Sequence, residues 1–394
     1  VLDQYRSTDL ICSCLIKVNP KVLIYATNRE WGGSEHLWYD AVSFLLDKGA
    51  DVHVLCEKSL LISSKQADLF SRCHLTYISR LPKSFKFILR ASRKFLGIDF
   101  ELDFRIRHIK SIKPDFVFIN QGLNFDAFDL LLWLSENNIN YGIISHAVDH
   151  RKSLNSIIIN ALKSGFAKST FNGFVSNANI HQTSAMIDME IPNTRVFRNP
   201  VSRPDNSNII PYPSSTIEFS LAFVGRIDFK VKGQDMLLQV LQYPKWQKRN
   251  LNVRFYGDGP DRKKLEILLL DFANGKHVYA GYKNPSEIWA ECHALVLTSH
   301  FEGLPIVIIE AGLYGRTCVV TNVSGNAELI SNHVDGFVAQ TDTIEAIDEA
   351  LESAWEHRLE WQQMGLLFKQ KLQDKLPNQP GKVLADTILE QVQR

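Results

Sequence analysis

Short apolar runs alternate with amphipathic stretches along nearly the whole chain, and this pattern restricts the possible folds more than any other feature. The first five runs have the length and apolar content of buried strands and occupy residues 21–28, 50–57, 114–122, 141–148 and 171–177. Residues 34–49 predict an amphipathic helix that ends at Gly49, where a left-handed cap is expected. Because strands that alternate with helices pair in parallel, the pattern predicts a doubly wound α/β sheet.

The alternation is interrupted once and then starts again. Residues 192–215 contain five of the 14 prolines together with Asn and Ser, which is typical of an extended hinge. Further strands are predicted at residues 219–226, 251–259, 277–282, 293–300 and 317–322. A chain of 394 residues exceeds one ordinary core, so we expect two Rossmann-like domains that face each other across a cleft. We place them at residues 1–200 and 201–375, with a helix at 376–394 that can pack back on the first.

Composition excludes several classes of protein. A formal net charge of +1 argues against a nucleic-acid-binding protein, which carries a strong basic excess. The six cysteines are scattered without a CxxC pair, which favours single thiols in a reducing compartment over a disulfide framework or a zinc site. No apolar run approaches the ~18 residues that span a bilayer, and residues 1–17 lack a signal-peptide pattern. We therefore expect a cytoplasmic protein.

Residues 300–316 combine the most apolar run of the chain with two carboxylates, Glu302 and Glu310. A buried, unpaired carboxylate is costly, so each of them needs a partner or a ligand. Pro305 suits the first turn of a helix and Gly315 suits its end, which places a buried helix between them and Glu302 on the preceding loop. The free N–H groups at the start of that helix would attract an anion into the cleft.

The two carboxylates can therefore flank a ligand whose anionic part meets the helix start and whose hydroxyl groups donate to Glu302 and Glu310. A nucleotide sugar has this layout of ribose, diphosphate and hexose. The alternative is structural, with Glu310 paired to a buried Arg or Lys.

Residues 223–235 supply positive charge at the end of a predicted strand. The strand ends at Gly225, and Arg226, Lys230 and Lys232 follow on the loop before a helix. The planar guanidinium and the point charge of an ammonium suit a pyrophosphate, and they would stabilise the charge of a departing phosphate. The alternative is a solvated basic loop.

A third candidate lies at residues 28–38, between the first strand and the first helix. Gly32 and Gly33 permit close approach of the backbone to a ligand, and Ser34 can help cap the helix. The segment does not match GxGxxG, so a dinucleotide site is unsupported. The alternative is an ordinary tight turn.

Four segments together resemble one known family. "FEGLPIVIIEAGLYGR", "VGR" followed by "KG", "YGDGP" and "GGSE" are similar to the retaining GT-B glycosyltransferases of glycosyltransferase family 4. The likeness covers nearly the whole chain, and the segment with Glu-x7-Glu is its most specific part. The resemblance implies a GT-B fold, with an acceptor-binding first domain and a donor-binding second domain.

The resemblance also implies roles for single residues. Glu310 would hold the ribose hydroxyls, and Glu302, with the backbone N–H groups beside it at Gly303 and Leu304, would hold the donor sugar. Arg226 and a lysine would bind the diphosphate. The remaining donor-binding positions implied are Gly225, Gly32, Gly33, Tyr282 and Lys283, the last two where the family's backbone meets the nucleobase.

Two positions depart from the family pattern. The family lysine usually follows the arginine by five residues, whereas Lys232 follows Arg226 by six, which leaves Lys230 as an alternative. The family often has His followed directly by Asp near the donor sugar. In "SHAVDH" His146 matches, but the acidic residue, Asp149, is displaced, and a strand-end histidine satisfied by the backbone is the alternative.

Asn120 and Gln121 end another predicted strand and are candidates for contact with the acceptor, although ordinary capping explains them equally well. We thus expect an enzyme that transfers a hexose-type sugar from a nucleotide diphosphate sugar to a glycan or lipid-linked acceptor, in bacterial surface polysaccharide or lipopolysaccharide synthesis. The rivals are a nucleotide-sugar epimerase and a non-catalytic nucleotide-sugar binding protein.

The resemblance implies retention of configuration by a front-face mechanism, in which the leaving phosphate helps deprotonate the acceptor hydroxyl. No protein nucleophile is then required. We expect no metal cofactor, because Arg226, Lys232 and the helix start can neutralise the diphosphate, and no Asp-x-Asp is placed to hold an ion.

Residues 80–113 carry ten Lys or Arg against three acidic residues. Within them, apolar and basic side chains fall on opposite faces of a predicted helix, which is typical of a protein that lies on an anionic membrane surface. The alternative is an apolar face that packs on its own domain. The expected location is the cytoplasm, with peripheral contact to the cytoplasmic face of the membrane.

Overall fold

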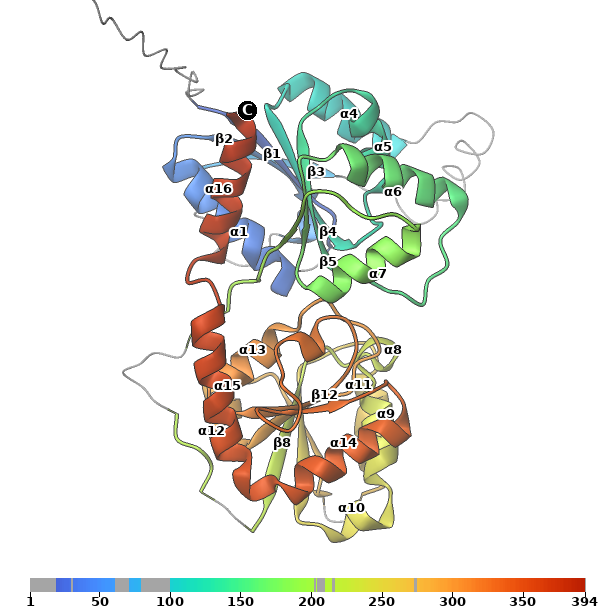
Figure 1. The fold of residues 1–394 in the computed structure, drawn as a ribbon, viewed down its shortest axis with the longest axis vertical. Helices are drawn as coiled ribbons and strands as arrows, with labels where there is room; N and C mark the ends of the chain where they lie inside the picture. Colours follow the sequence, from blue (N-terminus) through green and yellow to red (C-terminus); the bar gives the residue numbers. More distant parts are fainter. Residues whose placement is uncertain are drawn as a thin grey trace, which may run out of the picture.

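A computed structural model describes residues 19–29, 31–60, 71–78, 100–201, 203, 210–214, 217–272 and 275–393. They form two α/β domains, one above the other in Figure 1, each built on a parallel sheet with helices packed against it. The predicted fold class is confirmed. Most of the basic stretch at residues 80–113 lies outside the described residues.

The sheet of the first domain has seven strands in the described residues, in the order β3-β2-β1-β4-β5-β6-β7. All neighbours are parallel, and Val22 of β1 pairs with Val52 on one side and Phe116 on the other. The strands are β1 (Lys21–Ala26), β2 (Asp51–Glu57), β3 (His74–Ile78), β4 (Phe116–Leu123), β5 (Tyr141–Ala147), β6 (Phe171–Phe174) and β7 (Thr194–Val196).

Two apolar clusters cover the two faces of this sheet, which explains why the central strands are apolar almost throughout. The helices of the domain are α1 (Gly33–Asp47), α4 (Phe100–Ile112), α5 (Phe128–Glu136), α6 (Ser156–Lys168) and α7 (Asn177–Ile187). Helix α1 ends as predicted, since Gly49 adopts φ = 80° just beyond it.

The second sheet has six strands in the described residues, in the order β10-β9-β8-β11-β12-β13. Its strands are β8 (Phe219–Val224), β9 (Leu251–Tyr256), β10 (Val278–Gly281), β11 (Ala294–Leu297), β12 (Thr317–Thr321) and β13 (Phe337–Ala339). Its helices are α8 (Phe229–Lys232), α9 (Gln234–Leu241), α10 (Pro244–Lys248), α11 (Arg262–Leu269), α12 (Pro285–Glu291), α13 (Ile306–Leu313), α14 (Ile344–Glu356) and α15 (Trp361–Lys375).

The sequence patterns missed three short strands, β3, β7 and β13. Strand β7 lies inside the stretch predicted as an extended hinge, so that prediction is wrong for its first residues. In both sheets the strand order reverses beside the first strand, β1 or β8, and such reversals open a crevice at the carboxyl ends of the strands.

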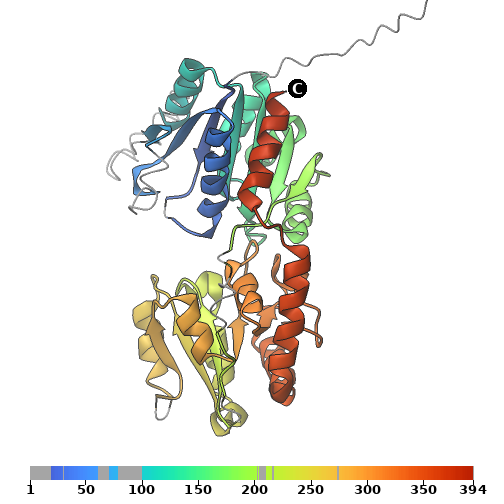
Figure 2. The same cartoon turned by 90° about the vertical axis from the view of Figure 1, so that its left-hand side faces the viewer.

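The last helix, α16 (Pro380–Val392), leaves the second domain and packs on the first, alongside α1 (Figures 1 and 2). Leu384, Ala385 and Ile388 are buried in the same apolar cluster as Trp38 of α1. Gly381 permits this contact, because a Cβ there would lie 2.4 Å from the Cβ of Asp40. None of the described helices is long and apolar enough to cross a membrane.

Candidate functional site

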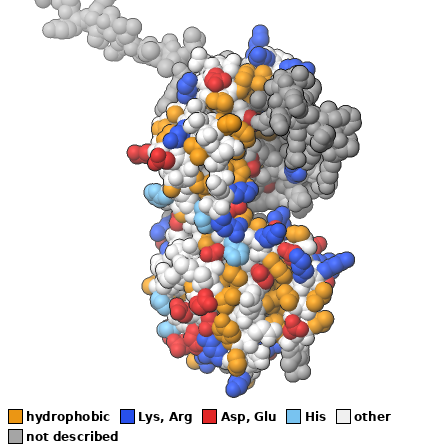
Figure 3. All heavy atoms as spheres, turned by 90° about the vertical axis from the view of Figure 1, so that its right-hand side faces the viewer, with side chains coloured by type: hydrophobic (Ala, Val, Ile, Leu, Met, Phe, Trp, Pro, Cys, Tyr) orange, Lys and Arg blue, Asp and Glu red, His pale blue; other side chains and the backbone are white. Residues whose placement is uncertain are grey.

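A cavity of 680 Å³ lies between the two domains at the carboxyl ends of their strands. The first domain contributes the ends of β4 and β5 and the loops after β1 and β4, and the second contributes the loops after β8 and β11. On the face seen in Figure 3, Lys and Arg side chains gather where the two domains meet. The predicted residues that line the cavity are Gly33, His146, Gly225, Lys232, Glu302, Gly303, Leu304 and Glu310.

Helix α13 begins at this cavity. Pro305 occupies the N-cap position with extended backbone, and the helix starts at Ile306 rather than at the proline. Its first N–H groups have no partner within the helix, so they are available to an anion in the cavity. Gly33 of the first domain packs against this helix start, since a Cβ at Gly33 would lie 2.4 Å from Cδ1 of Ile306.

Glu310 lines the cavity from α13 and is held by a tryptophan. The indole Nε1 of Trp289 donates a 3.0 Å hydrogen bond to its Oε1. Burial raises the pKa of the Glu310 carboxyl, and the hydrogen bond from Trp289 opposes this rise. Among the described residues, no Lys or Arg forms an ion pair with Glu310, which disfavours the structural alternative of a buried ion pair.

Glu302 and Lys232 form an ion pair at the cavity wall. Ser299 Oγ donates to the same carboxylate oxygen at 2.7 Å, so the position of Glu302 is defined by two donors. Lys232 ends α8, and Gly233 follows with φ = 64°. A Cβ at Gly233 would lie 2.2 Å from the carbonyl oxygen of Thr298, which is why a glycine must follow this lysine.

Of the two alternative lysines, only Lys232 lines the cavity. Lys230 is exposed, and its carbonyl oxygen accepts two 3.3 Å hydrogen bonds from the guanidinium of Arg151. Arg151 also bonds to Asp149 at 3.1 Å and lies over the ring of Phe301, 4.6 Å from its centroid. The displaced acidic residue therefore belongs to a contact between the domains.

A second cavity, of 850 Å³, adjoins the first and shares Gly33 and Lys232 with it. Gly32 and Arg226 line this second cavity. The guanidinium of Arg226 pairs with Asp228, and the side chain remains 55% exposed. Arg226 and Lys232 thus face the same space from the second domain.

The loop before α1 is organised by a carboxylate that sequence reasoning missed. Glu35 Oε2 accepts from the N–H of Gly32 at 3.0 Å and from Ser34 Oγ at 2.7 Å, while Asn28 donates to Oε1 at 2.7 Å. Burial raises the pKa of Glu35, and these hydrogen bonds oppose the rise. Glu35, rather than Ser34, therefore caps α1, because its carboxylate accepts from the backbone N–H of the N-cap residue Gly32.

The second cavity also contains an arginine that the sequence patterns did not single out. Arg105 of α4 is buried and makes bidentate hydrogen bonds to Asp129, at 2.5 and 3.3 Å, and a third bond to the hydroxyl of Tyr25. It lies within residues 80–113, where a membrane-facing basic surface was predicted. The basic side chains of that predicted surface, between Lys83 and Lys94, lie outside the described residues, so the membrane contact stays a prediction. The guanidinium of Arg105 faces the interior of the domain.

His146 lies at the end of β5 against the second domain. Its Nε2 is 2.8 Å from Oδ1 of Asn120, and burial lowers its pKa to about 3, so the imidazole is neutral at physiological pH. A Cβ at Gly303 would lie 1.6 Å from the carbonyl oxygen of His146. The two domains therefore touch at this point, and only a glycine fits there.

Besides Lys230, four predicted residues line neither cavity. Asn120 and Gln121 are fully buried, and Gln121 bonds to Ser145 Oγ and the N–H of Ala127. Both side chains thus bond within the first domain, and their contact with an acceptor stays a prediction. Tyr282 is 85% exposed, and Lys283 pairs with Glu291 at 2.8 Å, so the structure does not bring these two to the rest of the site.

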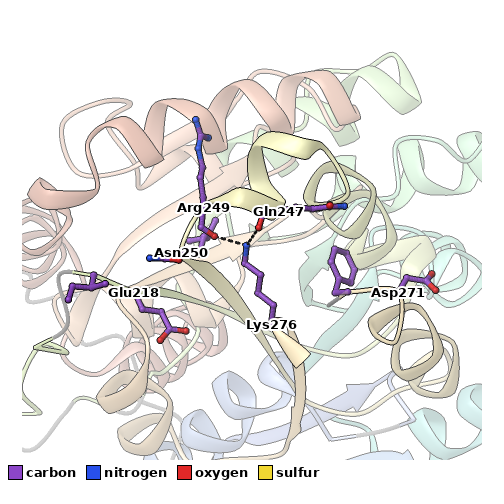
Figure 4. Close-up of a pocket in the computed structure, with 9 residues that line it drawn as sticks. Glu218, Gln247, Arg249, Asn250, Asp271 and Lys276 are labelled. Atoms are coloured by element: carbon purple, nitrogen blue, oxygen red, sulfur yellow. Dashed lines mark hydrogen bonds between the residues drawn. The ribbon is translucent and has the colours of Figure 1, made fainter. Parts of the chain in front are cut away.

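A third cavity, of 560 Å³, lies in the second domain and contains none of the predicted residues. Figure 4 shows Lys276 reaching the carbonyl oxygens of Gln247 and Arg249, at 2.9 and 2.5 Å. The ammonium group thereby donates to backbone carbonyl oxygens at the C-terminal end of α10. This pocket is separate from the cavities between the domains.

Comparison with known proteins identifies a family to which the second domain is similar. Residues 211–366 match the family model of the glycosyl transferases group 1. The match covers the second domain, which supplies Arg226, Lys232, Glu302 and Glu310.

Two of the curated relatives illustrate the degree of similarity. The chain is 28% identical over 209 residues to the lipopolysaccharide 1,6-galactosyltransferase of Escherichia coli strain K12, covering 50% of this chain and 53% of that one. It is 28% identical over 179 residues to an uncharacterized glycosyltransferase of Haemophilus influenzae, covering 43% and 46%. The chain thus matches these relatives over about half of their length.

Solved structures match over nearly the whole chain. Anabaena Alr3699/HepE in complex with UDP has a TM-score of 0.70 at 15% identity, covering 94% of this chain and 100% of that one. The lipopolysaccharide outer core galactosyltransferase WaaB, in its apo form, has a TM-score of 0.69 at 17% identity, covering 94% and 99%. The fold of the protein is therefore GT-B.

Proposed function

We propose that the protein is a retaining glycosyltransferase of family 4. It transfers a hexose-type sugar from a nucleotide diphosphate sugar to a glycan or lipid-linked acceptor in the synthesis of bacterial surface polysaccharide or lipopolysaccharide. The observation that carries the proposal is the convergence of Lys232, Glu302, Glu310 and the start of α13 on one cavity between the domains. The matched family and the name of the Escherichia coli relative support the same class of reaction.

The donor binds along the second domain. Glu310 accepts hydrogen bonds from the ribose hydroxyls, because Trp289 orients its carboxylate in the cavity wall. The diphosphate meets the N–H groups at the start of α13, with Lys232 and Arg226 on its other side. Glu302 and the backbone N–H groups of its two neighbours hold the hydroxyl groups of the sugar.

The chemical step needs positive charge around the leaving group. As the bond between the anomeric carbon and the diphosphate oxygen breaks, negative charge grows on the diphosphate, and Lys232, Arg226 and the helix start stabilise it. The acceptor hydroxyl attacks from the same face and passes its proton to a leaving phosphate oxygen, which retains the anomeric configuration. These groups supply the charge that a metal ion would otherwise provide, so we propose a metal-independent reaction.

The acceptor enters from the first domain. The second cavity adjoins the donor position and carries polar groups on its first-domain side, including Arg105 and Asp129. Hydroxyl-rich acceptors suit such a surface. A short match, 41% identical over 56 residues and covering 14% of each chain, is to an Escherichia coli galactosyltransferase whose name specifies a diphosphoundecaprenol-linked substrate. We propose a comparable lipid-linked acceptor, reached on the cytoplasmic face of the membrane.

The test is release of nucleoside diphosphate from a panel of nucleotide sugars, with and without candidate acceptors. A transferase releases the diphosphate in proportion to acceptor and forms a glycosylated product. Conversion of the donor sugar without an acceptor would instead indicate an epimerase. Tight nucleotide binding with no turnover on any acceptor would indicate a binding protein.

A further inference from the structure

Three polar side chains gather near the amino ends of β2 and β3, whereas the cavities lie at the carboxyl ends of the strands. Asp51 begins β2, and His53 follows two residues later on the same face of the strand. His74 begins β3 and is the direct register partner of His53. The topology therefore projects one carboxylate and two imidazoles from the same face of neighbouring strands.

The distances within this cluster fit a metal ion. Asp51 Oδ1 lies 3.3 Å from Nε2 of His53 and 3.3 Å from Nε2 of His74. In a tetrahedral zinc site with bonds of about 2.0–2.1 Å, two ligand atoms lie about 3.3–3.4 Å apart. The three ligand atoms all lie within 4.8 Å of one another, and the two rings are stacked with centroids 4.5 Å apart.

A further imidazole stands on the same face of the sheet. Helix α4 packs there, since Ile109 shares an apolar cluster with Leu23 and Leu55. The neighbouring residue, His108, has a buried Nε2 with no hydrogen-bond partner. His108 is not among the described side chains whose ligand atoms lie within 4.8 Å of one another, so we do not assign it to the cluster.

Hydrogen bonding alone accounts for only part of this arrangement. Both histidines can donate from Nε2 to Asp51, but both donor–acceptor distances are 3.3 Å, which is long for a hydrogen bond to a carboxylate. A cation among these groups satisfies the carboxylate and the imidazole nitrogens together. Imidazole and carboxylate are ligands that Zn²⁺ and its neighbours in the first transition row accept.

We propose that Asp51, His53 and His74 bind a divalent transition-metal ion, with a water molecule as the fourth ligand. The ion would join the edge strand β3 to β2. The ion would lie at the amino ends of the strands, whereas the two cavities lie at their carboxyl ends. It therefore serves the stability of the first domain rather than the transfer reaction. None of the four cysteines that the structure describes belongs to this ligand set.

Calorimetric titration of the full chain with zinc, after treatment with a chelator and dialysis, tests the proposal. We expect one ion per chain. His74→Ala and Asp51→Asn should each weaken binding by at least about tenfold, since even loss of a group that only orients a metal ligand costs 10–100-fold. His181→Ala removes an exposed histidine of α7 and should leave the affinity unchanged.

Folding of the variants does not confound this test. The His74 side chain is 70% exposed, so its removal creates no cavity, and circular dichroism checks each variant. Cobalt provides a second readout, because four-coordinate Co²⁺ absorbs visible light far more strongly than the hydrated ion. Absence of zinc binding, or binding that survives both His74→Ala and Asp51→Asn, would overturn the proposal.

Discussion

The ammonium group of Lys232 pairs with the carboxylate of Glu302, although 70 residues separate them in the sequence. One residue ends α8 and the other lies on the loop before α13, so the ion pair joins two of the loops that form the cavity wall. A nucleotide sugar placed there would meet the lysine with its diphosphate and the carboxylate with its sugar. In the proposed complex, the ion pair would therefore mark the boundary between these two parts of the ligand.

Lys232→Ala should lower kcat by about 10²–10³-fold, which corresponds to about 2.7–4 kcal/mol of lost stabilisation of the leaving group. Lys230→Ala is the matched control, because that side chain is exposed and lines neither cavity. Steady-state kinetics of the two variants, measured side by side, decide which lysine acts. Loss of activity only in Lys230→Ala would reverse the assignment.

Arg226→Ala should reduce turnover more than it reduces nucleotide affinity, because the diphosphate gains charge only as it leaves. The expected increase in the barrier is about 2–4 kcal/mol. The check is kcat together with the dissociation constant of the nucleoside diphosphate. Equal turnover in the variant and the parent would show that Arg226 does not stabilise the leaving diphosphate.

Glu310→Gln should weaken binding of the free nucleoside diphosphate, whereas Glu302→Gln should spare that binding and reduce transfer. The first carboxylate is proposed to meet the ribose and the second the sugar. Calorimetry with the nucleotide and a transfer assay separate the two effects. If both variants bind and transfer normally, the carboxylates have a structural role.

Nucleotide affinity should fall on acidification through protonation of Glu310. Burial raises the pKa of this carboxyl, so it protonates at a higher pH than an exposed glutamate and then loses its capacity to accept from both ribose hydroxyls. The affinity is therefore retained above the raised pKa and lost below it. The dependence of nucleotide affinity on pH should be weaker in the Glu310→Gln variant than in the parent.

Leu384→Ala should destabilise the protein by about 2–5 kcal/mol, because this side chain is fully buried between α16 and the first domain. Val383→Ala is the control, because the side chain of Val383, next to Leu384 in the sequence, is 47% exposed. Chemical denaturation measures the free energy of unfolding of both variants. Similar stabilities would mean that α16 is not held on α1 in solution.

The sequence predicted the fold because buried parallel strands form continuous apolar runs, and all ten predicted strands are present. Strands β3 and β7 lack this signal, since they lie at the sheet edges and are only partly buried. Near the site, local sequence sufficed for Glu302 and Glu310, which lie on one short segment. Arg105 could not be predicted, because its bonds to Asp129 and Tyr25 join three separate elements.

The return of α16 to the first domain means that the chain crosses between the domains twice. The two crossings lie beside each other, since Arg203 donates to the carbonyl oxygens of Leu376 and Pro377, at 3.5 and 3.4 Å. A single covalent tether would allow one domain to rotate freely against the other. Two adjacent tethers restrict such rotation, and a swing about the line through both is the relative motion that they hinder least.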